Sequence, residues 1–375
     1  MTDRVHNIRV LSLVGLPFIA GLIAIVFLWG RYVFWTDIVL MFGGYVLTTM
    51  GVCIGYHRML THKGFEAPAW LRWILLTLGA MAPEAPPDIW AATHIVHHAH
   101  SDEEGDPHSP IEGFWHAHIG WLFKQNNFAD PKEVAPHLLE DPVVVWVSKW
   151  TQVLIFLSFL IPFVIGGWTG LIWGGGVRAF LTTHVTWSVN SICHLFGKRP
   201  YNTTDGSRNN WLIGLLGFGE GWHNNHHAFP ENAFHGMHWW QVDLSGWTIR
   251  IWELLGIVRN VRRVTPQALA SFATYAEHRE ASIAEMKTAL GAAIVHAEEE
   301  ACAIFARTIE QSVSSFDKDQ CREVYEAYLR QLWSIRQSVE QSTRLKKKRL
   351  MAYFQEVQKG AGRVKEVMQR KLVRS

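Results

Sequence analysis

The chain has 375 residues, of which 49% are hydrophobic and 18% are charged, and its formal net charge is +2. A net charge this small argues against nucleic-acid binding, which needs a strongly basic surface. The length allows two domains. The apolar residues are too clustered along the chain to form one soluble core, so the composition favours an integral membrane protein.

The apolar stretches predict four membrane spans. The first, Val10–Gly30, contains no charged residue, and at about 1.5 Å per residue it crosses a hydrocarbon layer of roughly 30 Å. It is also too long for the apolar region of a removable signal peptide. The other three are expected near Ile38–Tyr56, Val153–Gly167 and Leu171–Trp187, the last interrupted by glycines and Arg178. Short linkers make each pair a helical hairpin.

The long segment between the second and third spans and the chain after the fourth span are expected on the same side of the membrane. Leu71–Met81 is apolar but too short to cross, so it predicts an interfacial or re-entrant helix. An even number of crossings separates the N-terminus, Tyr56–Trp150 and the chain after Asn190. The basic residues Arg4, Arg9, Lys63, Lys124 and Lys132, with many more in the tail, favour the cytosol for that side. A bacterial inner membrane or the endoplasmic reticulum is expected, with both termini cytosolic.

Residues 263–375 are charged and alanine-rich, with a helical period. Apolar residues recur every three or four positions, at Ile283, Met286, Leu290, Ile294, Ala297, Ala301 and Ile304 and again at Tyr328, Leu332, Ile335 and Val339. This spacing predicts a helix pair or coiled coil, with breaks at 314–319 and at Gly360–Gly362. No catalytic motif stands out there, so a structural, docking or homo-oligomerising role is expected.

The predicted fold class is therefore all-α. Residues 1–262 are expected to form a four-span transmembrane helical domain with a cytosolic cap that carries histidine clusters. Residues 263–375 are expected to form a coiled-coil-like helical extension.

Histidine is unusually frequent, with 20 residues in the chain. Eight of these form three short clusters, which are His57 and His62, then His94, His97 and His98, and last His223, His226 and His227. All three clusters lie on the predicted cytosolic side, so one site could collect them. Residues at i, i+3 and i+4 share a helix face, so each HxxHH triplet is predicted to aim three imidazoles at one point. His57 and His62 diverge by about 140° on an ideal helix, so one of them is expected near or beyond a helix end.

These clusters predict a metal site. A lone buried histidine is often a hydrogen-bonded core residue, but eight in spaced clusters argue against that interpretation for the set. Imidazole suits iron, copper, zinc or nickel, and eight ligands exceed the coordination number of one ion. Two metal ions are therefore expected, and the ligand type alone does not separate iron from zinc.

Six motifs stand in a fixed order along the chain. They are GYHRMLTH, HIVHH, DPHSP, GFWHAHIGWLF, NSICHLFGKRPY and GEGWHNNHHAFP. With these motifs, about residues 30 to 260 resemble the membrane fatty acid desaturases, and most closely their acyl-CoA delta-9 (stearoyl-CoA-like) branch.

The resemblance implies a ligand set and a reaction. The eight clustered histidines and His194 would hold a non-haem di-iron centre, with Asn190 reaching one iron through water. The centre would use O₂ to place a cis double bond in a saturated fatty acyl chain. The sequence carries no dinucleotide phosphate loop, iron–sulfur cysteine set or HPGG haem motif. Electrons are therefore expected from a separate donor, which the family implies is a cytochrome b5, a ferredoxin or a flavoprotein reductase.

The chemistry explains why such a site is needed. An unactivated methylene offers no acidic proton for base catalysis, so oxygen activation at iron is the remaining common route. Carboxylates could orient the imidazole N–H groups. The candidates are Asp88, Asp102, Glu104, Asp106 and Glu220. Alternatively, Asp106 and His108 could border the entrance for the substrate head group or form a plain turn.

Two departures from the branch bear on the acyl carrier. Thr93 precedes the second cluster, and Pro110–Glu112 precede GFWHAH, where relatives commonly have basic residues that would bind coenzyme A phosphates. Acyl-CoA is still the expected carrier, with lipid-linked or carrier-protein-linked chains as alternatives. A hydroxylase with the same di-iron core is the alternative enzyme. A multi-span metal transporter is the non-enzymatic alternative, but it should place ligands inside its spans.

Overall fold

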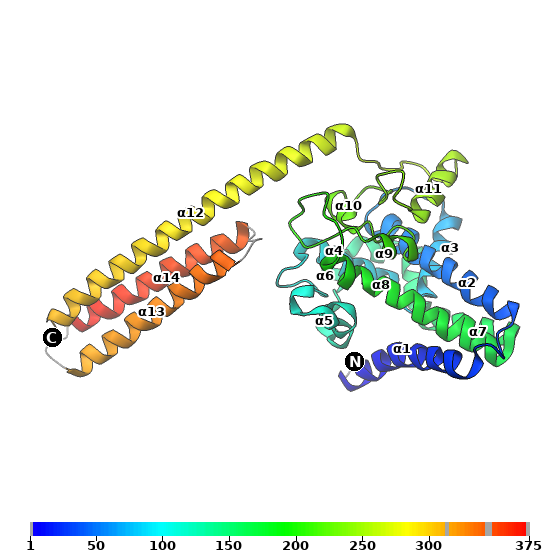
Figure 1. The fold of residues 1–375 in the computed structure, drawn as a ribbon, viewed down its shortest axis with the longest axis horizontal. Coiled ribbons are helices and arrows are strands. Elements are labelled where there is room, and N and C mark those ends of the chain that lie inside the picture. Colours follow the sequence, from blue (N-terminus) through cyan, green and yellow to red (C-terminus); the bar gives the residue numbers. More distant parts are fainter. Residues whose placement is uncertain (1–2, 312–314, 342–346, 373–375) are drawn as a thin grey trace. The chain divides into compact units, whose positions relative to one another are not determined.

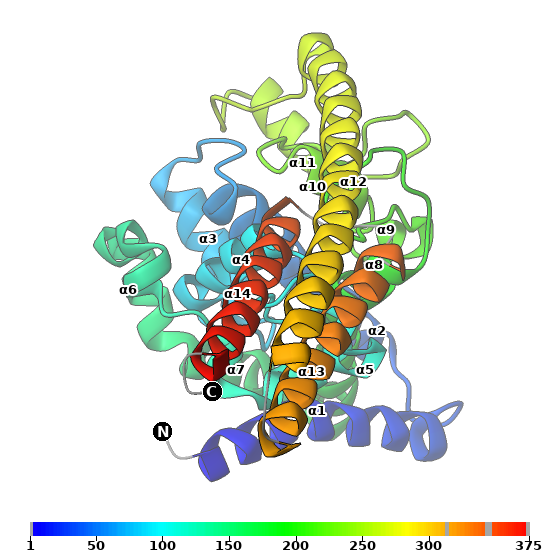
Figure 2. The same cartoon turned by 90° about the vertical axis from the view of Figure 1, so that its left-hand side faces the viewer.

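The computed structural model describes residues 3–311, 315–341 and 347–372, and in these ranges the regular structure is helical, without strands. The all-α prediction is confirmed for this part of the chain. Contacts divide the chain into two compact units, Met1–Leu269 and Ala270–Ser375, a few residues after the predicted boundary at 262. The elements of both units are shown in Figures 1 and 2.

Three segments of the first unit are long and apolar enough to cross a membrane, namely Val5–Leu28, Trp35–Thr61 and Pro142–Leu195. They comprise α1 (Asp3–Ile23) with the π-helix η1 (Ala24–Leu28), then α2 (Trp35–Met50) with the π-helix η2 (Gly51–Thr61), and last α7 (Pro142–Gly170), the π-helix η7 (Leu171–Val177) and α8 (Arg178–Leu195). Large apolar side chains such as Phe27 and Trp168 are exposed on these segments, as a lipid-facing surface requires.

The third segment reverses direction at Gly167. The backbone of Gly167 has φ 58°, in the left-handed region that glycine adopts without strain. Just beyond the turn, a Cβ atom on Gly170 would lie 2.3 Å from the carbonyl oxygen of Pro162. Farther along, Arg178 donates a 2.9 Å hydrogen bond to Oγ of Ser158. These contacts pair residues before and after the turn, so the third and fourth predicted spans form a hairpin. The count of four crossings stays a prediction.

Short elements connect the long ones. The apolar helix α3 (Ala69–Ala80) is too short to cross a membrane, as predicted. It packs closely on η2, because a Cβ atom on Gly51 would lie 2.2 Å from the backbone nitrogen of Gly79. The remaining elements are α4 (Pro87–His100), η3 (Pro110–Glu112), α5 (Phe114–His118), η4 (Gly120–Phe123), η5 (Gln125–Asn127), α6 (Pro131–Val134), η6 (Pro136–Glu140), α9 (Trp211–Leu216), α10 (His223–Ala228) and α11 (Leu244–Leu254).

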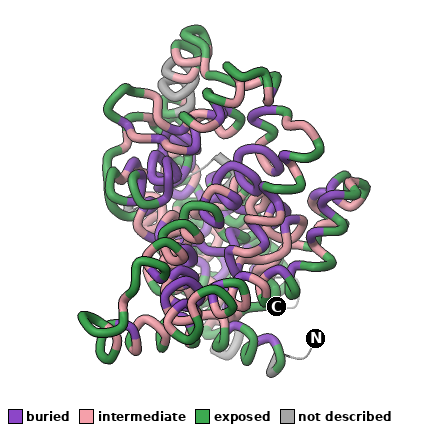
Figure 3. Tube along the Cα trace, turned by 90° about the vertical axis from the view of Figure 1, so that its right-hand side faces the viewer, coloured by how far each residue is buried: buried purple, intermediate pink, exposed green. Residues whose placement is uncertain are grey.

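Buried residues gather in the interior of the first unit (Figure 3). An apolar cluster that includes Ile54, Leu76, Val147 and Ile249 joins η2, α3, α7 and α11. Because these elements are distant in sequence, this core fixes where η2 and α4 present their histidines.

The second unit begins within α12 (Pro266–Gln311) and also contains α13 (Ser315–Gln341) and α14 (Lys347–Leu372). The predicted periodic positions Leu290, Ile294, Leu332 and Ile335 are buried in one apolar cluster that all three helices share. The sequence indicated a helix pair or coiled coil, and the third helix completes the same core. The oligomerising role of this unit stays a prediction.

One predicted break in the second unit is wrong. Helix α14 continues through Gly360–Gly362. A Cβ atom on Gly360 would lie 2.2 Å from the Tyr328 ring, and the Tyr328 hydroxyl donates to the Val357 carbonyl at 2.8 Å. Gly360 therefore allows a close helix contact and does not end the helix. The other break was expected at 314–319. Residue 314 of this range lies outside the described residues, whereas 315–319 are helical.

Candidate metal centre

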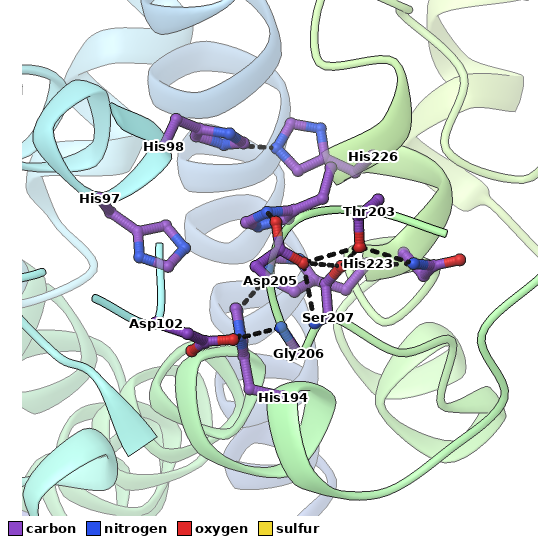
Figure 4. A network of polar contacts seen from close by, with 12 residues as sticks. His97, His98, Asp102, His194, Thr203, Asp205, Gly206, Ser207, His223 and His226 are labelled. Atoms are coloured by element: carbon purple, nitrogen blue, oxygen red, sulfur yellow. Dashed lines mark hydrogen bonds and ion pairs between the residues drawn. The ribbon is translucent and has the colours of Figure 1, made fainter. Parts of the chain in front are cut away.

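Nine histidines from four regions of the first unit converge on one site. His57 lies on η2 and His62 directly after it, His94, His97 and His98 lie on α4, His194 lies near the end of α8, and His223, His226 and His227 lie on α10. Figure 4 shows several of these imidazoles facing one another from separate elements. All eight clustered histidines and His194 therefore lie where one site could use them.

The nine imidazoles form two adjacent groups. We call His57, His62, His94, His98 and His226 the five-histidine group, and His97, His194, His223 and His227 the four-histidine group. Within each group the possible ligand nitrogens lie within 4.8 Å of one another. The groups adjoin, because the rings of His98 and His227 stack with centroids 4.5 Å apart.

The prediction that each HxxHH triplet aims at one point is wrong. His94 and His98 belong to the five-histidine group, whereas His97 belongs to the other. In α10, only His226 joins the five-histidine group. Successive residues on a helix point about 100° apart, so neighbouring histidines diverge. Each triplet therefore bridges both groups and holds them next to each other.

The π-helix η2 explains the five-residue spacing of the first cluster. The backbone N–H of His62 donates to the His57 carbonyl at 3.1 Å, a bond across five residues. The two rings consequently lie with centroids 4.8 Å apart. His62 also lies one residue beyond the helix end at Thr61, which confirms that expectation from the sequence.

The spacing of the nitrogens fits metal coordination. Nε2 of His226 lies 3.0 Å from Nε2 of His57 and 2.9 Å from Nε2 of His98, and in the other group Nε2 of His194 lies 3.0 Å from Nε2 of His223. Two imidazole nitrogens bound at right angles to an ion at about 2.1 Å would lie about 3 Å apart. Lone pairs this close to one another would repel without a cation between them.

The burial of the imidazoles also fits metal coordination. Nε2 of His97 and Nε2 of His227 are buried without a hydrogen-bond partner among the described residues. Burial, together with neighbouring histidines, holds the pKa of His94, His98 and His226 well below the ordinary value. These imidazoles are therefore neutral near pH 7, which is the form that binds metal.

Four carboxylates orient imidazoles from behind. Nδ1 of His97 donates to Asp106 at 2.9 Å, Nδ1 of His194 to Asp102 at 3.2 Å, Nδ1 of His227 to Asp205 at 2.9 Å, and Nδ1 of His57 to Glu220. A donated Nδ1–H leaves Nε2 unprotonated and directed toward the group. The four carboxylates thus set the tautomers that metal binding needs.

The carboxylates are held in the ionised form. Burial opposes ionisation of Asp106, but the adjacent His97 outweighs burial and keeps the pKa of Asp106 below its ordinary value. The same balance, with His227 as the partner, holds the pKa of Asp205 well below its ordinary value. The pKa of Glu220 is also lowered, by His57 and Arg58 against the effect of burial.

Of the carboxylates that the sequence suggested as imidazole partners, some contact the site and others do not. Asp102, Asp106 and Glu220 contact histidines of the site. Asp88 instead accepts from the backbone of Ile89, and Glu104 is exposed. The contacts of Asp106 support two of the roles considered for it, because it accepts from His97 and also accepts from the His108 backbone at 3.2 Å in a turn.

His108 is buried beside Asp106. Its ring centroid lies 4.3 Å from that of His97. Burial lowers the pKa of His108 to about 3, so the ring is neutral. Asn190 lies one turn before His194 on α8 and so shares its helix face.

Three residues beside the site were not predicted from the sequence. Asp205 lies in a loop with no periodic signal. Arg58 follows a histidine in a segment that reads as a membrane span, yet its buried guanidinium contacts both Glu220 and Asp243. His235 is buried with its ring 4.5 Å from that of His226. His235 is the first histidine of the sequence HGMH, and its spacing matched none of the three histidine clusters.

The fold and the site together define a helical membrane protein whose buried histidines could hold two metal ions. Residues 34–250 match the fatty acid desaturase family. This match covers more than half of the chain, so the protein belongs to that family.

Curated relatives agree with the family match. The chain is 41% identical to the sn-1 stearoyl-lipid 9-desaturase of Anabaena variabilis, over 57% of this chain and 79% of the relative. It is 37% identical to the sn-2 palmitoyl-lipid 9-desaturase of Nostoc sp. (strain 36), over 61% and 82%. It is 40% identical to the acyl-CoA C20 Delta5-desaturase of Anemone leveillei, over 56% and 69%.

Proposed function

We propose that the protein is an oxygen-dependent desaturase that introduces a cis double bond into a saturated fatty acyl chain at a non-haem di-iron centre. The observation that carries this proposal is the pair of adjacent histidine groups with their nitrogens at coordination spacing. The family match supports the reaction class. The same geometry in a protein of another family would support only metal binding.

Each histidine group would hold one iron. The five-histidine group offers five imidazoles, and the four-histidine group offers four. Asn190 lies four residues before His194 on α8, and the family resemblance implies that it would complete the four-histidine group through a water molecule. No carboxylate oxygen belongs to either group as the structure describes them, which agrees with an all-imidazole inner set of ligands.

The bound irons would supply the reduction of O₂ that removal of two unactivated hydrogens requires. One O₂, two electrons, two protons and the two hydrogens of the acyl chain would yield the alkene and two waters. The protein itself fixes the ligands, because Asp102, Asp106, Asp205 and Glu220 hold the Nδ1 protons of four imidazoles. Burial of the site keeps bulk water away from the reacting carbons.

The proposed topology places the site on the cytosolic side. His57 lies near the end of the second candidate span and His194 near the end of the third segment, and both reach the same site, so these ends lie on one side. Nε2 of His6 contacts the Leu122 carbonyl at 2.8 Å, which brings the start of α1 to the loop on that side. An electron donor such as a cytochrome b5, a ferredoxin or a flavoprotein would approach from there.

The proposed double-bond position is carbon 9. Two of the three relatives above are named for position 9, and the third is named for position 5. Their names cover lipid-linked and CoA-linked chains alike. Glu112 and Thr93 stand where CoA-using relatives commonly have basic residues, so the acyl-CoA expectation is one arm of the test below.

Expression in a desaturase-deficient host tests the proposal. Gas chromatography with mass spectrometry of the host lipids should show new monounsaturated chains that depend on iron and oxygen. Comparing the CoA-linked and lipid-linked pools early after induction identifies the carrier. Purified protein should contain about two irons per chain, since each group offers one coordination site. Hydroxylated chains, or bound metal with no lipid change when a competent donor is present, would overturn the desaturase proposal.

A further inference from the structure

The two histidine groups differ in the carboxylates behind them. In the four-histidine group, three imidazoles donate to carboxylates, as His97 does to Asp106, His194 to Asp102 and His227 to Asp205. In the five-histidine group, only His57 contacts a carboxylate within the part of the chain that the structure describes, and that carboxylate is Glu220. The negative charge around the centre is therefore unevenly distributed.

The single carboxylate of the five-histidine group is shared with a cation. The fully buried guanidinium of Arg58 contacts Glu220 at 3.1 Å and Asp243 at 2.9 Å. Glu220 thus divides its charge between His57 and Arg58. An imidazole that donates to a carboxylate is a stronger ligand, and a neighbouring cation reduces this effect.

The carboxylates of the four-histidine group are fixed by neutral donors. The backbone N–H of Asp102 donates to Asp106 at 2.8 Å, which ties two of these carboxylates together on one loop. Asp205 accepts from the Thr203 hydroxyl at 2.9 Å and from the Ser207 backbone at 2.9 Å. Figure 4 shows Asp102 and Asp205 in this network beside His194. Such bonds hold each carboxylate in place and favour its charged form.

We infer that the four-histidine group binds its divalent cation more tightly than the five-histidine group and fills first. The inference rests on the proposed function, in which each group holds one iron. Loss of a carboxylate behind a ligand typically lowers metal affinity about 10- to 100-fold. Two additional carboxylates therefore outweigh the one additional imidazole of the five-histidine group. Asp102, Asp106 and Asp205 are positioning residues that act through the imidazoles.

Stepwise loading of the full-length protein tests this order. Metal-free protein in lipid nanodiscs would receive ferrous iron at buffered free concentrations without oxygen, and bound iron would be counted by elemental mass spectrometry. Two steps at least about 10-fold apart are expected. His227→Ala should remove the tighter step, and His62→Ala should remove the weaker one. A single step, or loss of the weaker step in His227→Ala, overturns the inference.

Charge-removing variants identify the cause of the order. Asp102 has φ 59°, which asparagine also tolerates, so Asp102→Asn removes the charge and keeps an acceptor oxygen. It should weaken the tighter step about 10- to 100-fold and leave the weaker step in place. Glu220→Gln is the matched control and should weaken the other step. Equal weakening of both steps in Asp102→Asn would indicate a structural role and overturn the assignment.

Two further results complete the design. Asp205→Asn repeats the test on a second imidazole if Asp102→Asn fails to fold by circular dichroism, and it should weaken the same tighter step. Wild-type protein that binds fewer than two irons contradicts the proposed function. Wild-type protein that binds two irons with equal affinity contradicts only the loading order.

Discussion

The two units of the chain are both helical, but they bury different groups. The first unit buries charged and polar side chains, among them Arg58, Asp106 and Glu220, in addition to its apolar core. In the described part of the second unit, the buried side chains are largely apolar, and Thr308 is the polar exception. Burying charge costs free energy unless each charge is paired and hydrogen-bonded. The interior of the first unit is therefore built around a site, whereas the interior of the second unit holds its helices together.

The largest expected effect comes from His98→Ala. Nε2 of His98 lies 3.1 Å from Nε2 of His94 and 2.9 Å from Nε2 of His226, so His98 connects α4 to α10 within the five-histidine group. The variant should lose desaturation completely in the lipid assay while remaining inserted in the membrane. His100→Ala, on the same helix but in neither group, should keep most of its activity. Full turnover by His98→Ala would remove this residue from the metal ligands.

Arg58→Met should cost the first unit about 3–5 kcal/mol, because it leaves Glu220 and Asp243 buried without their cation. Thermal unfolding of the purified protein, followed by fluorescence of its tryptophans, measures this loss. Arg72 provides the control, since its side chain is 29% exposed where it pairs with Asp141. Arg72→Met should cost at most about 1 kcal/mol. Equal losses in the two variants would contradict the role of Arg58 as the centre of a buried charge network.

Leu332→Ala should destabilise the second unit by about 2–5 kcal/mol, because this side chain is fully buried in the shared helical core. Circular dichroism should show an earlier loss of helix, while iron content and desaturation stay unchanged. Gln331→Ala changes an exposed neighbour and should be close to neutral. Loss of iron in Leu332→Ala would show that the two units are not independent.

The smallest effect is expected from removing the second unit. The family match ends at residue 250 and the first compact unit at Leu269. A chain that stops after Leu269 should therefore retain two irons and desaturation in the host-lipid assay. If the truncated chain loses either, the second unit contributes to the centre, and the two units are not functionally separate.

The sequence by itself predicted much of the fold. Apolar length and helical period are local properties, so α3 and the periodic faces of the second unit were visible without a structure. Gly360 shows the limit of such patterns. Its ordinary effect is to end helices, but here the contact with Tyr328, from a different helix, decides its role.

The candidate site was also predictable from the sequence only in part. The eight clustered histidines could be named from their spacing, and His194 and Asn190 from the family resemblance, because clusters and motifs are continuous in sequence. The division of each HxxHH triplet between two groups required the tertiary structure, since it depends on where α4 and α10 face each other. The carboxylates also required it, because Glu220 reaches His57 across 163 positions of the chain. The sequence by itself determined the candidate ligands, and the fold decided which four of them contact a carboxylate, because pairing across such distances follows from packing and leaves no periodic signal.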